Sequence, residues 1–345
     1  MRRKVFGMVT ENLRMATERN ENTMIQEIGK HRFHNEYQPC AQPKADSRVL
    51  FYRGREIFVK REENSISFLS YDEVMHVCPY LEEEATFLFT IDGTDFFLFR
   101  KFGEEKIRAS RLNRTEPDEH QGHDSVESKA CSGSGEESLW NADGLPELFS
   151  GYTWEKIELM RTTGPKEAAF AGVTGMQLYG WYKSRRFCPA CGRRMVHSEK
   201  ERMMHCEACG QMEYPKICPA VIVGVTCKDK ILLTKYAGRT FKKYALIAGF
   251  AEIGETIEET VEREVMEEVG LKVKNIRYYK SQPWSFTDTL LMGFFAEVDG
   301  ESDIILDETE LSEGKWCTRD EVPENDGVSL TREMMSVFKY QRIPF

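Results

Sequence analysis

Long uncharged apolar runs are missing from this sequence of 345 residues. No stretch reaches the ~18 to 20 apolar residues that a membrane span needs, and residues 1–20 lack the apolar core of a secretory signal. We therefore expect a cytoplasmic protein with no membrane partner. An excess of positive charge is also missing, since 47 basic and 57 acidic residues give a net charge of −10. This balance argues against a protein built for nonspecific binding to polyphosphates.

A disulfide scaffold is excluded by the small share of cysteine, ten residues in all. Without a secretory signal these cysteines should be reduced thiols. Four of them form two Cys-x-x-Cys pairs with fourteen residues between the pairs: Cys188, Cys191, Cys206 and Cys209. Such pairs can place four thiolates around one structural zinc ion. His197 and His205 lie between the pairs, and we expect them at the surface because four thiolates already fill the coordination shell.

Internal repeats are absent, and the length predicts at least two hydrophobic cores. Alternating apolar runs at 49–52 and 85–90, separated by turn residues, indicate a β-rich domain over residues 1–150. Within it, residues 112–139 are rich in Ser, Glu, Gly and His and have few large apolar side chains. We expect a long loop or a disordered insertion there.

The remainder of the chain divides by pattern into three segments. Apolar spacing over 168–182 predicts a helix, which we place in a helical connector at 151–184. The zinc ribbon follows at 185–215. The last segment, 216–345, begins with an expected β-hairpin around the turn at 228–230 and has a further expected strand over 290–298.

Acidic residues are concentrated between residues 249 and 271, which contain eight Glu and one Arg. Thr256 and Glu259 form a capping box that starts a helix near Ile257, and Gly270 is placed to end it. The apolar stripe of this helix is Ile257, Val261, Val265 and Val269. Because Glu264, Glu267 and Glu268 are three and four residues apart, their carboxylates can converge on one side. Oxygen ligands in such a group suit Mg²⁺ or Mn²⁺.

The same segment fits the pattern Gly-x5-Glu-x7-Arg-Glu-U-x-Glu-Glu-x-Gly-U, where U is bulky and aliphatic. The matching residues are Gly249, Glu255, Arg263, Glu264, Val265, Glu267, Glu268, Gly270 and Leu271. This is the signature of the Nudix hydrolases. A zinc ribbon directly before it resembles one subfamily, the NADH pyrophosphatases that also remove NAD caps from RNA. The resemblance implies an α+β protein: a β-rich N-terminal domain, a four-cysteine ribbon and a Nudix α/β/α sandwich with a mixed sheet.

A third feature resembles the specificity array Ser-Gln-Pro-Trp-Pro-Phe-Pro-x-Ser of this subfamily. The corresponding residues are Ser281, Gln282, Pro283, Trp284, Ser285, Phe286, Thr287, Asp288 and Thr289. Ser285 and Thr287 replace prolines and Thr289 replaces a serine. The loss of two prolines frees φ at those positions, so the loop and its substrate preference can differ from the family pattern.

Further roles follow from the resemblance. Tyr214 and Phe250 match the aromatic residues that sandwich the nicotinamide, often from different protomers, which implies a homodimer. Glu310 matches an additional metal-binding Glu, the carbonyl of Ala248 would complete the metal shell, and Thr331 would close the substrate pocket. Glu264, Glu267, Glu268 and Glu310 would hold Mg²⁺ or Mn²⁺, while Arg263 orients the glutamates and Glu255 supports or bridges the metal ions. Glu268 or Glu267 would accept the proton of the attacking water.

These parts predict hydrolysis of the pyrophosphate of NAD(H) to NMN(H) and AMP, or of an NAD cap to give NMN and RNA with a 5′-monophosphate. The ranking of NADH, NAD⁺ and NAD-capped RNA stays open. A hydrolase of ADP-ribose or another nucleoside diphosphate derivative is a second hypothesis, because the box specifies only diphosphate chemistry. A zinc-ribbon regulator that senses a nucleotide without cleaving it is a third, and the complete set of glutamates argues against it.

Overall fold

The computed structural model describes residues 24–77, 85–99, 148–238, 243–324 and 327–340. The chain divides into two compact units, one of Lys30–Pro215 and one that joins Met1–Gly29 to Lys216–Phe345. The insertion expected near 112–139 lies outside the described residues. None of the helices in the described part of the chain is both long and apolar enough to span a bilayer.

The unit Lys30–Pro215 contains two small sheets ahead of the ribbon. The first has the order β1-β7-β8-β2-β6 and contains β1 (Phe33–His34), β2 (Arg48–Leu50), β6 (Leu69–Ser70), β7 (Ala85–Ile91) and β8 (Thr94–Phe99). The second contains β3 (Tyr52–Arg53), β4 (Glu56–Glu62), β5 (Ser65–Ser67) and β9 (Tyr152–Lys156), and the helix α2 (Tyr71–Val77) follows β6. The expected run at 85–90 is a strand, and the run at 49–52 is split into β2 and β3. Asp92 and Gly93 both have positive φ, which is the geometry of a two-residue hairpin.

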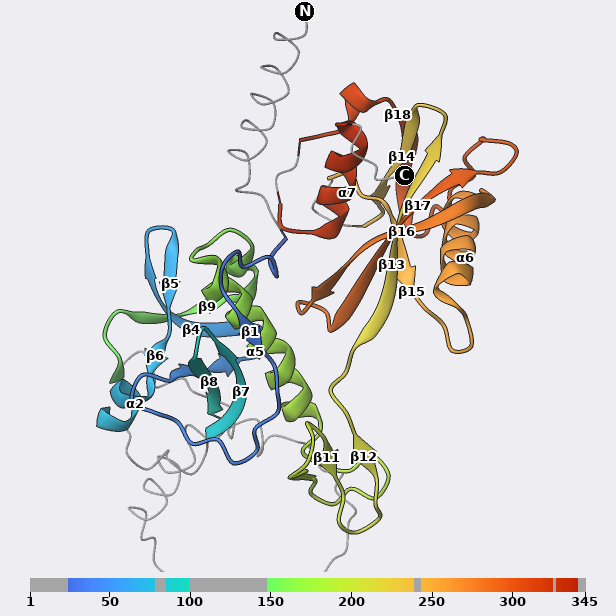
Figure 1. Cartoon of the computed structure of the whole chain (residues 1–345). Helices are drawn as coiled ribbons and strands as arrows, with labels where there is room; N and C mark the ends of the chain where they lie inside the picture. Colours follow the sequence, from blue (N-terminus) through green and yellow to red (C-terminus); the bar gives the residue numbers. More distant parts are fainter. Residues whose placement is uncertain (1–23, 78–84, 100–147, 239–242, 325–326, 341–345) are drawn as a thin grey trace, which may run out of the picture. The chain divides into compact units, whose positions relative to one another are not determined.

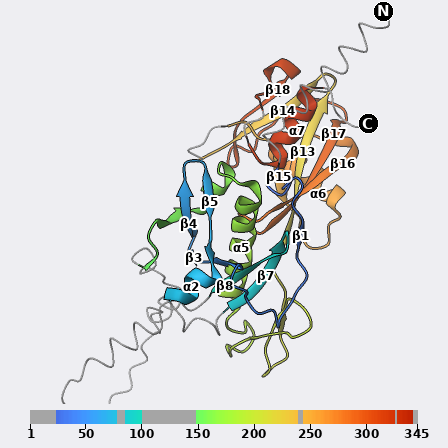
Figure 2. The ribbon, with the colours of Figure 1, turned by 60° about the vertical axis from the view of Figure 1, so that its left-hand side comes forward.

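The helix expected over 168–182 is confirmed as α5 (Lys166–Ser184), and a 3-10 helix, η3 (Ile157–Arg161), precedes it. The start of the expected helical connector is not helical. It contains the strand β9, which pairs with β4, and the rings of Trp154 and Phe58 are 5.1 Å apart. Figure 2 shows α5 between the β4–β5 hairpin and β7. A Cβ atom at Gly175 would lie 2.3 Å from the hydroxyl oxygen of Tyr52, so this helix needs glycine to pack so closely.

Three short antiparallel strands follow α5: β10 (Val196–His197), β11 (Met204–His205) and β12 (Met212–Glu213). They carry the two cysteine pairs in the loops before β10 and between β11 and β12. This arrangement is a zinc ribbon, as the sequence predicts.

A mixed sheet of six strands is the centre of the second unit. Its order is β16-β17-β13-β14-β18, with β15 paired to β13. The strands are β13 (Cys218–Cys227), β14 (Lys230–Tyr236), β15 (Ile247–Phe250), β16 (Val273–Trp284), β17 (Thr289–Val298) and β18 (Leu311–Cys317). The β13–β14 hairpin and the strand at 290–298 are therefore confirmed. The pair β13–β17 is parallel, while the other pairs in the sheet are antiparallel.

Two helices cover opposite faces of this sheet, α6 (Ile257–Val269) and α7 (Leu330–Lys339), and a 3-10 helix, η4 (Arg319–Glu321), precedes α7 (Figure 1). The valines of α6 pack with Val221, Val223 and Phe294 in one core. Met334 and Phe338 of α7 pack with Ile222 and Phe295 in the other. The alternation of β13 side chains between the two cores gives the α/β/α sandwich, so the α+β fold class is confirmed.

Candidate functional site

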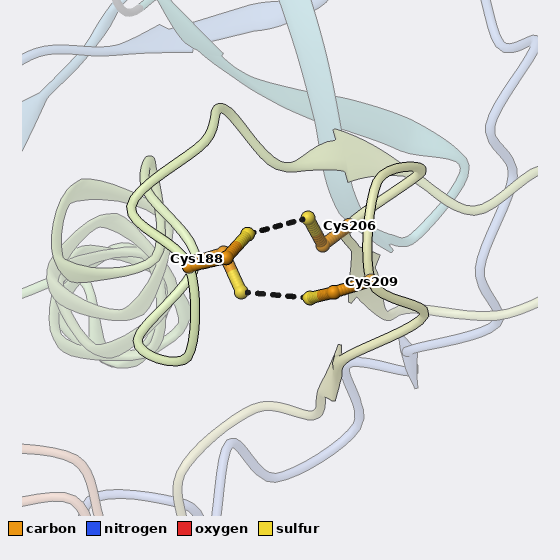
Figure 3. A group of neighbouring side chains, drawn as sticks. Cys188, Cys206 and Cys209 are labelled. Carbon is orange, nitrogen blue, oxygen red and sulfur yellow. Dashed lines mark hydrogen bonds between the residues drawn. The ribbon is translucent and has the colours of Figure 1, made fainter.

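The four sulfurs of Cys188, Cys191, Cys206 and Cys209 all lie within 4.8 Å of one another. The Sγ atoms of Cys188 and Cys209 are 3.5 Å apart, as are those of Cys191 and Cys206. Figure 3 shows Cys206 and Cys209 facing Cys188 across a narrow gap. Four thiol ligands at this spacing fit one tetrahedral zinc ion, which would close the site to substrates.

Each cysteine pair ends in a glycine that turns the chain. Gly192 and Gly210 have φ of 72° and 76°, and their N–H groups donate to the carbonyls of Cys188 and Cys206 at 2.9 and 2.8 Å. Although desolvation acts in the opposite direction, the amides of Cys209 and Ala208 help lower the pKa of Cys206 to about 7. A lowered pKa favours the thiolate that a zinc ion binds.

The two histidines between the cysteine pairs are outside this cluster. His197 stacks on Tyr182 with ring centroids 5.0 Å apart, and His205 lies in β11. Both are half-buried instead of fully exposed, and the Tyr182 ring covers one face of His197.

The capping box and the glycine end of the acidic helix are confirmed. The Thr256 hydroxyl accepts from the Glu259 N–H at 3.2 Å, and the Glu259 carboxylate accepts from the Thr256 N–H at 2.7 Å. Gly270 ends α6 with φ of 68°. The valine stripe of α6 is fully buried, which fixes the rotation of the helix and therefore the direction of its glutamates.

Burial separates the three glutamates that the sequence groups together. Glu268 and Glu264 are 2% and 9% exposed, whereas the Glu267 side chain is 61% exposed. All three lie on one side of α6, since one Arg263 nitrogen bonds both Glu264 and Glu267, but only Glu264 and Glu268 are shielded from solvent. Desolvation, reinforced by the charges of Glu264 and Glu310, raises the pKa of Glu268 to about 8. Desolvation also raises the pKa of Glu264, although Arg263 opposes that shift.

Neither carboxylate oxygen of Glu268 has a hydrogen-bond partner at normal distance. The main chain of Ala248 is close enough to lower the pKa of Glu268 slightly, but it leaves the carboxylate oxygens without a full bond. A buried carboxylate without partners is costly in a protein interior, and a cation is the usual compensation. This observation identifies the place where a divalent ion fits.

Gly249 of β15 lies directly against Glu264. A Cβ atom at this position would be 1.9 Å from the carboxylate carbon of Glu264. Only glycine leaves the space in which the Glu264 carboxylate rests, which explains the first glycine of the motif in physical terms.

Arg263 joins the acidic residues of the motif. Its guanidinium donates to Glu255 at 2.5 and 2.9 Å, to Glu264 at 2.7 Å and to Glu267 at 3.0 Å. It also donates to the Phe250 carbonyl at 2.9 Å. The bonds from Arg263 and from the Glu252 amide lower the pKa of Glu255 to about 2. Arg263 thus connects Glu264 to the Phe250 carbonyl at the end of β15 and to Glu255 in the loop before α6.

Glu310 lies in the turn before β18, close enough to Glu264 and Glu268 for its charge to act on them. The segment is attached to the end of α6, because the Ile305 and Asp307 amides donate to the carbonyls of Val269 and Glu268. Glu310 is exposed, and its charge acts on both Glu264 and Glu268. Among the described residues, the four cysteines are the one group of potential metal ligands that lie within 4.8 Å of one another. The carboxylates of Glu264, Glu268 and Glu310 are therefore more widely spaced than the cysteine sulfurs.

The residues resembling the specificity array form the end of β16 and its turn into β17. Trp284 pairs with Thr289, and the Trp284 and Phe286 rings are 4.9 Å apart. Phe286 and Ser285 are buried, whereas Pro283 and Thr287 are exposed. The hydroxyls of Thr287 and Thr289 are 2.9 Å apart, and Asp288 is 3.7 Å from Lys216. Hydrogen bonds within the turn therefore replace the rigidity that two prolines would give.

Gln282 departs from the expectation that it contacts substrate. Its side chain is fully buried, and its amide nitrogen donates to the Gln26 Oε1 atom at 2.9 Å and to the Val328 carbonyl at 3.0 Å. Its Oε1 atom accepts from the Leu330 N–H at 2.7 Å. The Gln282 side chain therefore makes its hydrogen bonds to other parts of the protein. Thr331, half-buried, is the next residue along α7.

Tyr214 and Phe250, the two expected nicotinamide contacts, lie in different units and are 52% and 54% exposed. The Tyr214 hydroxyl donates to Glu201 at 3.1 Å. The Phe250 ring projects from the end of β15, immediately after Gly249. Both rings are therefore exposed enough to stack on a planar group.

Sequence reasoning from the motifs missed Gln26, Glu27 and Asp307. Asp307 holds the turn before Glu310 by accepting from the Thr309 N–H and hydroxyl at 2.8 and 2.6 Å. The Asp-x-Thr spacing is a turn signal that could have found it. No local signal marks Gln26, because its partner is 256 residues away.

Comparison with known proteins matches two family models to this chain: the NADH pyrophosphatase zinc ribbon domain at residues 183–214 and the NUDIX domain at residues 216–338. The chain is 44% identical over 149 residues to the NAD-capped RNA hydrolase NudC of Salmonella schwarzengrund (strain CVM19633). It has the same identity over the same length to the protein of that name from Escherichia coli (strain K12 / DH10B). Each alignment covers 43% of this chain, and the chain spans only 58% of the length of these relatives.

Among solved structures, the chain is similar to a NUDIX hydrolase from Nitrosomonas europaea. The identity is 24% and the TM-score is 0.40, with 46% of this chain and 93% of that chain covered. The assignment of two domains rests on the two family models. Residues 183–214 are therefore an NADH pyrophosphatase zinc ribbon domain, and residues 216–338 are a Nudix domain.

Proposed function

We propose that this protein hydrolyses the pyrophosphate linkage of NAD(H) to NMN(H) and AMP, and that it also removes NAD caps from RNA to leave a 5′-monophosphate. The matched ribbon model is that of NADH pyrophosphatases, and the two relatives described above are named NAD-capped RNA hydrolases. Because the alignment covers only part of those relatives, the activity and the substrates are proposals for this chain.

One observation carries the proposal: Glu268 is a buried carboxylate without a hydrogen-bond partner, beside Glu264 and within reach of the charge of Glu310. Oxygen ligands of this kind fit Mg²⁺ or Mn²⁺, and the carbonyl of Ala248 is proposed as a further oxygen ligand. A sensor that only binds a nucleotide has no need to bury such a group.

When bound, the divalent ions would neutralise the anionic oxygens of the pyrophosphate and make water a better nucleophile. The chain supplies the remaining chemistry. Arg263 holds Glu264 at the ion site through the 2.7 Å bond, and Gly249 leaves space for its carboxylate. Burial raises the pKa of Glu268 to about 8 in the protein without metal, and a bound divalent ion would lower it again, so Glu268 would ionise as the ion binds.

The nicotinamide is proposed to stack on the exposed rings of Phe250 and Tyr214, with the Trp284–Thr289 hairpin and Thr331 lining the pocket. A homodimer is part of this proposal, because an aromatic wall from a second protomer would complete the pocket. A cytoplasmic location is also proposed, since the four thiols of the ribbon persist in a reducing compartment.

Product analysis tests the proposed function. Purified protein is incubated with NADH in Mg²⁺ or Mn²⁺, and the products are separated by chromatography. We expect NMNH and AMP in equal amounts with either ion and neither product when EDTA is present. Intact NADH under all conditions, alongside cleavage of ADP-ribose, would favour the hydrolase of other nucleoside diphosphates instead. Failure to cleave either compound while binding it would favour a regulator.

A further inference from the structure

A short segment from the start of the described chain belongs to the Nudix unit. Residues 24–28, here called the N-terminal clasp, precede the β-rich unit in sequence, yet they are grouped with Lys216–Phe345. Met24, Ile25 and Ile28 are buried. Met24 packs in the core that contains Met334 and Phe338 of α7. The clasp therefore contributes a buried side chain to the same hydrophobic core as α7.

The clasp is bonded to Gln282 through Gln26. The Gln26 amide nitrogen donates to the Met24 sulfur at 3.4 Å, which directs its Oε1 atom toward Gln282 Nε2 at 2.9 Å. The Ile25 N–H donates to the Val328 carbonyl at 3.3 Å, and Gln282 donates to the same carbonyl. Three distant parts of the chain thus meet at one buried amide.

A charged contact anchors the clasp at a second point. The Lys280 ammonium group donates to Glu27 at 2.5 Å and to Glu333 of α7 at 3.1 Å. The Tyr279 hydroxyl also donates to Glu333, at 2.6 Å. Lys280 and Gln282 are alternate residues of β16, so both anchors act on the strand that leads into the Trp284–Thr289 hairpin.

We propose that Gln26 is a positioning residue for the substrate pocket, acting through Gln282 on the hairpin at 284–289 and on the start of α7. The clasp would then set how the Nudix domain binds its dinucleotide. This inference rests on the proposed function, since it assigns the pocket to those two elements.

Gln26 can act on the pocket because it provides a hydrogen-bond partner for the buried side-chain amide of Gln282. Gln282 uses both its amide nitrogen and its oxygen to join β16 to residues 328–330, and Gln26 accepts one of the nitrogen's hydrogen bonds. Without that acceptor, a buried N–H would lack a partner, which favours rotation of the Gln282 side chain or entry of water. Either change loosens the bond to the Leu330 N–H, next to Thr331.

The test uses the full chain with Gln26→Ala, with Gln26→Glu, which keeps an acceptor oxygen, and with Gln38→Ala as a control at an exposed glutamine. Two quantities are measured: kcat and KM for NADH, and hydrogen exchange of the amides at 328–331. For Gln26→Ala we expect KM to rise about fivefold, the change that about 1 kcal/mol produces, while kcat stays within about twofold. Exchange at Leu330 should accelerate, and Gln26→Glu should restore both values.

Unchanged KM and unchanged exchange in Gln26→Ala would overturn the proposal. So would a loss of kcat and melting temperature together that Gln26→Glu does not restore, because that is the result of a purely structural role. If Gln26→Ala does not fold, Gln26→Asn provides a milder perturbation that draws the amide oxygen back from Gln282, and unchanged exchange at 328–331 in that variant overturns the proposal. If even the unsubstituted chain fails to hydrolyse NADH, the proposed function fails, and the exchange result alone decides the role of the clasp.

Discussion

Gly249 and Glu264 touch so closely that a single added carbon at position 249 would overlap the Glu264 carboxylate, at 1.9 Å from its carbon. Gly249→Ala should therefore displace Glu264 from Arg263 and from the proposed ion site. We expect hydrolysis to fall at least about tenfold and stability to fall by about 1 to 3 kcal/mol, as in other overpacked sites. Mn²⁺ affinity by calorimetric titration and the rate on NADH provide the check.

Gly180→Ala is the matched control, because a Cβ at that helical position meets nothing within 4 Å. It should leave hydrolysis unchanged and stabilise α5 by about 0.5 to 1 kcal/mol. Equal rates for the Gly249 variant and this control would contradict the packing argument.

The affinity for a divalent ion should rise with pH, because the ion binds the ionised form of Glu268 while the folded protein holds its pKa at about 8. Between pH 6 and 8 the apparent affinity for Mn²⁺ should increase by up to about tenfold per pH unit and then level off. The stability of the metal-free protein should change in the opposite direction. The raised pKa stabilises the fold fully below about 4.5, and that contribution is lost as the pH approaches 8. Titrations at several pH values measure the first effect, and an affinity independent of pH would disprove it.

The acidic helix was the most predictable element, because all its signals are local. Its capping box, valine stripe and terminal glycine occupy consecutive turns. Helical geometry also accounts for the differing burial of the glutamates. At about 100° per residue, Glu268 and Glu264 lie about 60° and 100° from the centre of the valine stripe, and Glu267 lies about 160° away. That order matches their exposure, because Glu268 and Glu264 are buried and the Glu267 side chain is 61% exposed.

Other features depend on contacts between distant residues, which a single sequence does not reveal. Gln282 resembles a substrate contact in the sequence, yet its three hydrogen bonds go to residues 26, 328 and 330. Likewise, the sequence predicts a helical connector where β9 lies, because the pairing of β9 with β4 spans about a hundred residues of chain and leaves no local signal. Tertiary pairing overrides local pattern at such positions.

Zinc should be bound with about one ion per chain, and Cys188→Ser should lose it. Because structural zinc contributes directly to the free energy of folding, we expect the melting temperature to fall by about 5 °C or more. Metal analysis and thermal unfolding measure both effects. Cys40→Ser, at an exposed cysteine outside the cluster, should keep its zinc and its melting temperature; a zinc content unaffected by either substitution would refute the assignment.

Phe250→Ala should weaken binding of the nicotinamide without unfolding the protein, because the side chain is more than half exposed. By analogy with base stacking, the loss should be about 1 to 3 kcal/mol and should appear as a higher KM for NADH. ADP-ribose lacks the nicotinamide, so its KM should not change. If both substrates are affected equally, Phe250 has another role and the broader diphosphate hypothesis gains support.

The most direct test of the account is the rate of NADH hydrolysis by Glu268→Gln at saturating Mg²⁺. Glutamine keeps the size of the side chain and removes both the charge that binds the ion and the group that accepts the proton. The account predicts a fall of at least about 10² to 10⁴-fold in the formation of NMNH and AMP, with a melting temperature that is not lowered. Hydrolysis at the unsubstituted rate would contradict it, because the buried carboxylate at the centre of the site would then have no part in the reaction.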